Sequence, residues 1–341
     1  MKKLLNTLFV TTQELYLRLE GEAVAAVKAH ETVARFPLHA LAGIVTFGSV
    51  TVSPYLAAKC AELGLTLSCL DVNGRFLARF TGPISGNVRL RLAQVHAYDR
   101  PEHKDEIARS CLIGKLANTR AVLLRRLRDH GANAAVAEAA EALLDILRRV
   151  RDAEPEVGRL RGLEGEAAAL YFGVFNELLV PENDAFAIHS RNRRPPRDPM
   201  NALLSFLYTL LAHDCRGACE AVGLDPQIGF LHEIRPGRMS LALDLMEEFR
   251  ARFADRLALT LVNLRQVAEK DFVRTESGAV VLKESARKAV LIAWQKRKQE
   301  PARHPYLGDK VPLGLFPHLQ AILLARHLRG ELDAYPPFIA T

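Results

Sequence analysis

The chain has 341 residues, and its 49% hydrophobic and 25% charged content is that of an ordinary globular protein and excludes a mainly disordered one. No apolar run approaches the roughly 18 residues of a membrane span, and the amino-terminal stretch lacks the long apolar core of a signal peptide. The formal net charge is +7, and 34 of the 46 basic residues are arginines, whose planar guanidinium groups match phosphate oxygens two at a time. Five cysteines without a CxxC pair favour reduced thiols and predict a cytoplasmic protein. The absence of a long apolar run predicts no membrane segment, and the arginine content predicts a polyanion as partner.

The first part of the chain, to about residue 85, is predicted to be mostly strand. Residues 43–52 are rich in β-branched side chains, which favour a half-buried sheet. One short helix is expected after Ser53, because serine is a good N-cap and a proline follows it in the first turn. Apolar runs on both sides of Asn73-Gly74 predict a hairpin, since that pair tolerates the positive φ angles of a tight turn.

A boundary is predicted at residues 81–87, where glycine and proline interrupt the pattern and the apolar period becomes helical. We therefore expect an α+β fold with a small N-terminal β-rich domain, residues 1–85, followed by a larger α-helical catalytic domain, residues 86–341. Within the second domain, the sequence predicts a hairpin around Ser277-Gly278 and a loop over residues 301–317.

Two segments place carboxylates where a helix would bring them together. If residues 240–253 form a helix, Asp244 and Glu247 lie three residues apart on the face opposite the apolar arc. In the stretch GLEGEAAALYF, Glu164 lies in the middle of the apolar arc, where a carboxylate is costly unless it is paired or bound to a metal. The alternatives are a solvated polar face for Asp244 and Glu247, and a buried ion pair with an arginine for Glu164.

A histidine precedes the acidic helix and completes a candidate metal site. Glu164, His232, Asp244 and Glu247 together offer hard oxygen ligands and one imidazole. Such a set suits Mg²⁺ or Mn²⁺ better than zinc, which favours more histidine or cysteine. The sequence therefore predicts a divalent-metal site assembled from three separate segments.

Arginines surround this candidate site in the sequence. Arg235 and Arg238 lie between His232 and the acidic helix and are predicted to hold phosphates. A second group lies in a proline-stiffened loop and is predicted to clamp a nucleic-acid backbone, with a solvated loop as the alternative. The members of this group that we assign to DNA binding are Arg193, Arg194 and Arg197.

These residues resemble a known family, the integrase of CRISPR adaptation, which is the first-numbered CRISPR-associated protein. The resemblance rests on GLEGEAAALYF, NALLSFLY and GFLHE followed by GRMSLALDLMEE, in this order along the chain. The Arg-Pro-Pro loop and the NGRF hairpin resemble the branch found in subtype I-C systems. Many members carry two aspartates three apart on the acidic helix, whereas this chain has Asp244 and then Glu247. Asp244 is thus the first choice as direct ligand, and the choice between Glu247 and Glu248 stays open.

The resemblance implies a β-rich N-terminal domain that forms a homodimer and a helical domain that holds a divalent metal on Glu164, His232 and the acidic helix. It also implies a larger adaptation complex with the small second-numbered CRISPR-associated protein. The complex would act on spacer precursor DNA and on the leader and repeat of the CRISPR array.

The reaction expected from this resemblance is metal-assisted phosphoryl transfer, in which a DNA 3′-hydroxyl attacks a phosphodiester of the repeat. With water as the nucleophile, the same site would act as an endonuclease. Two other functions remain open on the residues alone. A non-catalytic nucleic-acid-binding subunit would need the arginines but not the acids, and a small-molecule metallophosphatase would need the acids but not the arginine loop.

Overall fold

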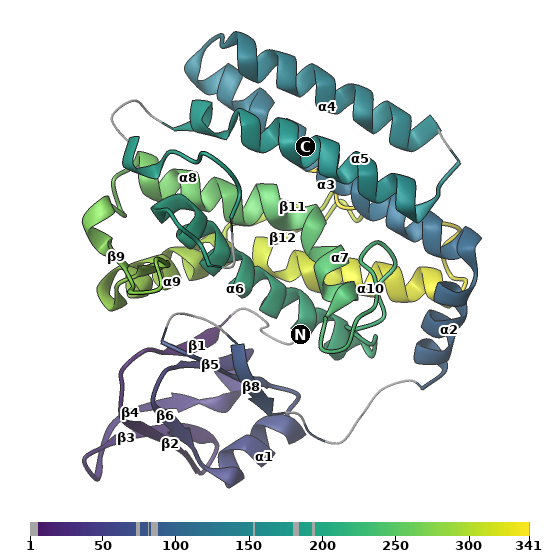
Figure 1. The fold of residues 1–341 in the computed structure, drawn as a ribbon. Helices are drawn as coiled ribbons and strands as arrows, with labels where there is room; N and C mark the ends of the chain where they lie inside the picture. The colour runs from purple at the N-terminus through teal and green to yellow at the C-terminus, as the bar shows by residue number, and fades with distance from the viewer. Residues whose placement is uncertain are drawn as a thin grey trace. The chain divides into compact units, whose positions relative to one another are not determined.

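A computed structural model describes residues 6–72, 76–80, 82, 88–152, 154–179, 184–192 and 195–340. Strands dominate the first part of the chain and helices the rest (Figure 1), so the predicted α+β class is confirmed. The chain divides into two compact units. The first contains Met1–Gly86, Leu282–Glu300 and Pro312–Leu315, and the second contains Asn87–Val281, Pro301–Val311 and Phe316–Thr341. Among the described residues, none of the helices has the length and apolarity that crossing a membrane requires.

The first unit contains two four-stranded sheets. One has the order β1-β5-β7-β8, in which β1, β5 and β7 are parallel and β8 runs antiparallel to β7. Its strands are Thr7–Val10, Gly43–Phe47, Thr66–Leu70 and Phe76–Phe80. The other has the order β4-β3-β2-β6, with strands Glu31–Pro37, Ala23–Lys28, Leu15–Glu20 and Val50–Val52. The predicted pairing around Asn73-Gly74 is present as β7 and β8, although the turn itself lies outside the described residues.

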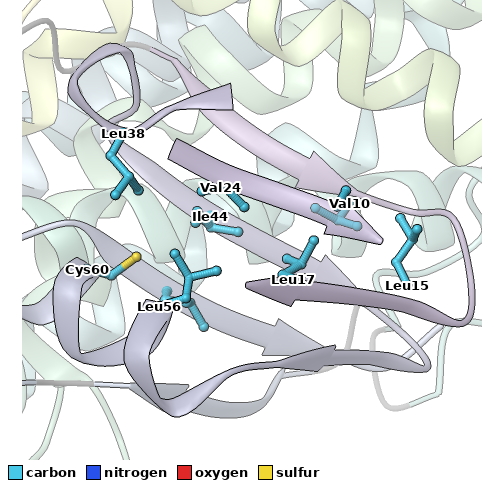
Figure 2. Packing of buried hydrophobic residues seen from close by; sticks show 10 residues of the cluster. Val10, Leu15, Leu17, Val24, Leu38, Ile44, Leu56 and Cys60 are labelled. Atoms are coloured by element: carbon cyan, nitrogen blue, oxygen red, sulfur yellow. The ribbon is translucent and has the colours of Figure 1, made fainter. Parts of the chain in front are cut away.

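The core of the first unit forms between these sheets and α1 (Pro54–Glu62). Figure 2 shows Leu17 and Ile44, from different sheets, close to Leu56 of α1, and all three are fully buried. Ser53 caps α1 as predicted, because its side-chain oxygen accepts from the backbone N–H of Leu56 at 3.2 Å. The same unit also holds the 3₁₀ turn η1 (Leu38–Ala40), the helix α9 (Glu284–Gln299) and the turn η6 (Leu313–Leu315).

The second unit is mostly helical. Its α-helices are α2 (Val88–Asp99), α3 (Pro101–His130), α4 (Ala134–Asp152), α5 (Val157–Gly173), α6 (Pro199–Val222), α7 (Ser240–Phe249), α8 (Arg256–Asn263) and α10 (Phe316–Leu328). A π-helical segment, η4 (Arg250–Asp255), joins α7 to α8, and the 3₁₀ turns are η2 (Phe175–Leu178), η3 (Asp184–Phe186) and η5 (Glu269–Asp271).

Two short strand pairs complete the second unit. The hairpin predicted around Ser277-Gly278 is confirmed as β9 (Phe272–Arg274) and β10 (Val280–Leu282). The prediction of a plain loop over residues 301–317 is wrong, because β11 (Pro301–Arg303) pairs there with β12 (Lys310–Pro312). The β9–β10 hairpin has a Ser-Gly turn and a run of β-branched residues to indicate it, whereas β11 and β12 have no such apolar run.

The acidic helix α7 is enclosed by its neighbours, packing against α3, α6 and α10. Asp244 and Glu248 are fully buried and Glu247 is 3% exposed. The alternative of a solvated polar face is therefore wrong, because the fold buries Asp244 and Glu247 as well as the apolar arc. A buried carboxylate needs a partner, and each of these three acids has a different one.

Candidate active site

Asp244 holds the backbone of the segment that precedes α7. Its carboxylate accepts from three consecutive backbone N–H groups, at 2.5 Å from Phe230, 3.0 Å from Leu231 and 2.8 Å from His232. The segment can wrap this closely because residue 229 is glycine. A Cβ atom there would lie 2.5 Å from the carbonyl carbon of Ser240 and 2.7 Å from Asp244 Oδ2. The sequence places Gly229 here for close approach, not for a turn.

The same carboxylate orients the ring of His232. Asp244 Oδ1 lies 2.7 Å from His232 Nδ1, and because an ionised carboxylate only accepts, Nδ1 carries the proton of the neutral ring. The other nitrogen, Nε2, then has a free lone pair and lies 3.7 Å from Glu247 Oε1. Arg161 of α5 fixes the segment from the other side, donating to the Leu231 carbonyl at 2.7 Å. A ring held in this way is typical of metal-binding histidines.

A lysine ammonium lies between the two glutamates of the predicted site. Lys115 Nζ of α3 is 2.8 Å from Glu247 Oε2 and also pairs with Glu164 Oε1 of α5. The expected burial of Glu164 is only partial, since its side chain remains 32% exposed, whereas that of Glu247 is 2% exposed. The alternative of an ion pair for Glu164 is thus realised with a lysine rather than with an arginine.

Glu247 is the most strongly held acid of the site. Arg250 Nη2, one turn further along, lies 2.7 Å from Glu247 Oε1. Burial alone would raise the pKa of Glu247, but the charges of Arg250 and Lys115 outweigh it and lower the pKa to about 2. The carboxylate is therefore ionised at every physiological pH.

Beside the two glutamates lies a small cavity lined by residues of α3, α5, α6, α7 and η4, among them Glu164, Glu247, Tyr171, Tyr208 and Asp255. Tyr208 donates to Asp255 at 2.6 Å and Tyr171 at 3.2 Å, and burial raises the pKa of Asp255 to about 6. The π-helical segment supplies both Arg250 and Asp255, and such segments are frequent at functional sites.

Glu248 points away from this cavity into a separate buried network. It accepts from Tyr335 Oη at 2.5 Å, from Gln320 Nε2 at 3.0 Å and from the Phe338 backbone N–H at 2.6 Å. Burial raises the pKa of Glu248 to about 8, although these donors act in the opposite direction. Of the two glutamates that the sequence left open, only Glu247 reaches Lys115.

Glu164, Glu247 and His232 carry donor atoms of the kinds that suit a divalent cation. Within the part of the chain that the structure describes, three His, Cys, Asp or Glu side chains do not form a ready metal-binding group, and Lys115 lies between Glu164 and Glu247. That ammonium is itself a cation, so its place marks a point where the two carboxylates converge, and His232 Nε2 lies 3.7 Å from the other oxygen of Glu247. Two oxygen donors and one imidazole match the preference of Mg²⁺ or Mn²⁺. The Asp244 oxygens are already taken up by N–H groups.

Of the predicted phosphate-binding arginines, the structure describes Arg197, Arg235 and Arg238. Arg193 and Arg194 fall outside the described residues. Arg197 is exposed, and its backbone N–H donates to Asn192 Oδ1 at 2.7 Å. Arg235 is also exposed, and its Nη2 lies 2.7 Å from Glu233 Oε2. Arg238 lies between Arg235 and the start of α7 along the chain, and it is partly buried.

Sequence reasoning missed Lys115, Arg250 and Arg161. A signal for Lys115 existed, because it lies on the buried face of α3, next to Leu116 and one turn after Cys111. A lysine on an apolar face needs a buried acid as partner. The sequence could not show which acid, since Lys115 and Glu247 are far apart along the chain and meet only in the fold.

Comparison with known proteins identifies relatives over almost the whole chain. The family model described as CRISPR associated protein Cas1 matches residues 8–296. A protein of Rhodospirillum rubrum described as CRISPR-associated endonuclease Cas1 2 is 55% identical over 344 residues, which cover 99% of this chain and 99% of that protein. A protein of Chlorobaculum tepidum described as CRISPR-associated endonuclease Cas1 1 is 48% identical over 342 residues, with 99% of each chain covered.

Solved structures share the fold. A CAS1 protein from Thermotoga maritima gives a TM-score of 0.82 at 23% identity, over 95% of this chain and 97% of that one. A casposase bound to integration product gives 0.81 at 24% identity, over 97% and 93%. A chain of a Cas6-RT-Cas1–Cas2 complex gives 0.82 at 24% identity, over 99% of this chain and 36% of that one. At these identities the likeness concerns the α+β architecture alone.

Proposed function

The chain belongs to the Cas1 family, and we propose that it is a metal-dependent DNA endonuclease and integrase of CRISPR adaptation. In this reaction the 3′-hydroxyl of a spacer DNA attacks a phosphodiester of the repeat, and with water as nucleophile the same site cleaves DNA. The observation that carries the proposal is that Lys115 bridges the carboxylates of Glu164 and Glu247, while His232 Nε2 lies 3.7 Å from Glu247 Oε1. Cas1 nucleases are generally metal-dependent, and Mg²⁺ or Mn²⁺ is the metal that this donor set favours.

Three side chains would hold the metal: Glu164, Glu247 and His232. When bound, a divalent cation lowers the pKa of a coordinated hydroxyl or water and offsets the charge that develops on the phosphoryl oxygens. The sequence favoured Asp244 as a direct metal ligand, but we propose a different contribution. It fixes the proton on His232 Nδ1 and holds the segment that carries the ring, so we assign it a positioning role.

The cations of the site act on the DNA phosphate. Lys115 neutralises the two glutamates, and a cation that takes over this role would leave its ammonium to contact a non-bridging phosphate oxygen. Arg250 stays paired with Glu247 and is further fixed by the ring of Tyr208, 4.8 Å away. Such pre-oriented positive charge stabilises a developing oxyanion without reorganisation of the protein.

DNA binding is proposed for the arginines that the sequence selected. Arg193, Arg194, Arg197, Arg235 and Arg238 would contact backbone phosphates of spacer precursor and leader-repeat DNA, which the net charge of +7 supports. A contact of this kind gives affinity but no sequence preference.

The proposed assembly is a homodimer through residues 1–85 that binds the small partner Cas2. In support of a dimer, the edge strand β8 exposes Phe76, Leu77 and Phe80 at 45%, 58% and 41%, and exposed apolar edge strands favour pairing. In support of the partner, a structure with the same fold contains Cas1 together with Cas2. The subtype I-C assignment rests on the Arg-Pro-Pro loop and the NGRF stretch. A cytoplasmic location is supported by five free cysteines.

An integration assay tests this function. Labelled spacer DNA, a plasmid that carries leader and repeat, the partner Cas2 and either Mg²⁺ or Mn²⁺ should give joined products with the wild-type protein. Glu164→Ala, His232→Ala and Asp244→Ala should each abolish joining while the far-UV circular dichroism spectrum is retained. Joining that persists in any two of these variants would refute the assignment.

A further inference from the structure

The segment Tyr335–Ala340 lies across α3 and α7 and is bound to both helices. To α7 it is bound by Glu248, which accepts from the Tyr335 hydroxyl at 2.5 Å and from the Phe338 N–H at 2.6 Å. The rings of Phe338 and Phe249 are stacked with centroids 5.2 Å apart, and both are buried. We call residues 335–340 the strap.

To α3 the strap is bound by Asn118, whose side-chain amide makes three hydrogen bonds at one point. Its Nδ2 donates to the Phe338 carbonyl at 2.8 Å and to the Glu248 carbonyl at 2.7 Å. Its Oδ1 accepts from the Ala340 N–H at 2.7 Å. One buried side chain of α3 thus joins the strap and α7 together.

Gly114 shows how closely the three elements meet. A Cβ atom at this position would lie 3.0 Å from Glu248 Cγ, 3.2 Å from the Phe338 carbonyl oxygen and 3.2 Å from Pro337 Cβ. The backbone of α3 therefore touches both α7 and the strap. Even a methyl group would have to displace one of them by a few tenths of an ångström.

On each helix, the residue adjacent to this contact belongs to the candidate active site. Gly114 precedes Lys115 on α3, and Glu248 follows Glu247 on α7. The crossing of α3 and α7 thus has two sides. One carries the Lys115 to Glu247 pair at 2.8 Å, and the other is closed by the strap.

We propose that the strap sets the spacing of α3 and α7, and that Glu248 and Asn118 are positioning residues for Lys115 and Glu247. No described strap residue lines the cavity beside the two glutamates, so the strap acts only through the helices. A fully satisfied network of buried polar groups rigidifies the core and specifies one arrangement of it. A fixed geometry is what the network supplies, and functional groups tolerate only about 0.5 Å of displacement.

The inference rests on the proposed metal-dependent function, and full-length variants test it. Gly114→Ala inserts a small wedge into the crossing, Glu248→Ala removes the acceptor, and Glu248→Gln keeps one acceptor oxygen. The matched control is Gly173→Ala on α5, where a Cβ atom meets nothing within 4 Å. Mn²⁺ affinity is measured by titration calorimetry well below each melting temperature, together with kcat and KM for strand transfer.

We expect Gly114→Ala and Glu248→Ala to weaken Mn²⁺ binding by roughly 10- to 100-fold, the range seen when residues that orient ligands are lost. Their kcat should fall while KM for DNA is unchanged, because the arginine loops are not touched. Glu248→Gln should retain most of the affinity, and Gly173→Ala should match the wild type.

Wild-type Mn²⁺ affinity in a folded Glu248→Ala or Gly114→Ala protein would overturn the inference, since a strap that only stabilises the fold would lower the melting temperature alone. If neither variant folds, Tyr335→Phe decides, because it removes one hydroxyl and keeps the ring. Its affinity should fall in the same direction by a smaller factor, and wild-type affinity would again overturn the inference. A wild-type protein that binds Mn²⁺ but joins no DNA would instead refute the proposed function.

Discussion

Replacement of Lys115 by methionine is the sharpest test of the site, because it removes one cation and keeps the aliphatic stem. Lys115 lies between Glu164 and Glu247, of which Glu247 is buried. Loss of one partner from a buried ion pair costs about 3–5 kcal/mol. Glu247 keeps Arg250 at 2.7 Å, so we expect the lower end, about 3 kcal/mol, in the metal-free protein. For a unit of this size the melting temperature should fall by roughly 6–12 °C.

The assay is thermal unfolding with and without Mn²⁺. Because the ammonium no longer competes for the two carboxylates, Mn²⁺ should bind Lys115→Met more tightly than the wild type and should raise its melting temperature more. Strand transfer should nevertheless be slower, since the proposed contact to the phosphate is lost. Wild-type stability without metal, or weaker Mn²⁺ binding in the variant, would refute the reasoning.

The chain offers a matched control for this experiment. Lys59 also lies between two glutamates, at 3.6 Å from Glu22 and 3.4 Å from Glu62. Those glutamate side chains are 73% and 67% exposed, so the pairs are solvent-screened and contribute little to stability. Lys59→Met should therefore change neither the Mn²⁺ response nor the rate of strand transfer.

Three further predictions concern other parts of the second unit. Gly229→Ala should lower the free energy of unfolding by roughly 1–3 kcal/mol through overpacking against Ser240 and Asp244, and should abolish strand transfer by displacing His232; a variant as active as Gly173→Ala would contradict this. Burial raises the pKa of Asp255 from 3.8 to about 6, so its contribution to stability is complete below pH 3.8 and is lost as pH rises through 6. Asp255→Asn should remove this loss, roughly 3 kcal/mol at most, from urea unfolding curves recorded between pH 4 and 7, and parallel profiles for the two proteins would speak against it. The third change replaces three arginines together, namely Arg193, Arg194 and Arg197. It should weaken binding equally for DNAs of unrelated sequence and flatten the log–log dependence of affinity on salt by roughly 0.9 per lost duplex phosphate contact. An unchanged slope would mean that the loop is only a solvated connector.

The sequence predicted the residues of the site better than their roles. Glu164 and His232 could be selected because each breaks a local rule, an acid on an apolar arc and an imidazole ahead of an acidic helix. The role of Asp244 could not be selected in this way. Helical periodicity places Asp244 on the polar face with Glu247. Only the fold shows that the segment 229–232 covers Asp244 and that α3 covers Glu247.

Lys115 illustrates the second limit. Local patterning describes how a helix divides its own faces, whereas the partner of a buried charge is chosen by a contact between distant segments. The family resemblance, which the comparisons confirm, named the acids because they stand in motifs. Lys115 stands in none of these motifs and was therefore missed.

The two adjacent glutamates of α7 show why one helix can carry opposite chemistry on neighbouring residues. Successive residues of an α-helix differ by about 100° in direction, so Glu247 and Glu248 face different surroundings although both are buried. Glu247 meets the cations Arg250 and Lys115, and its pKa falls to about 2, whereas Glu248 meets neutral donors, and burial raises its pKa to about 8. An ionised acid is what a cation site needs, and an acid surrounded by neutral donors is suited to hold a segment in place. The helix α7 thus connects the candidate metal site on one side to the strap on the other.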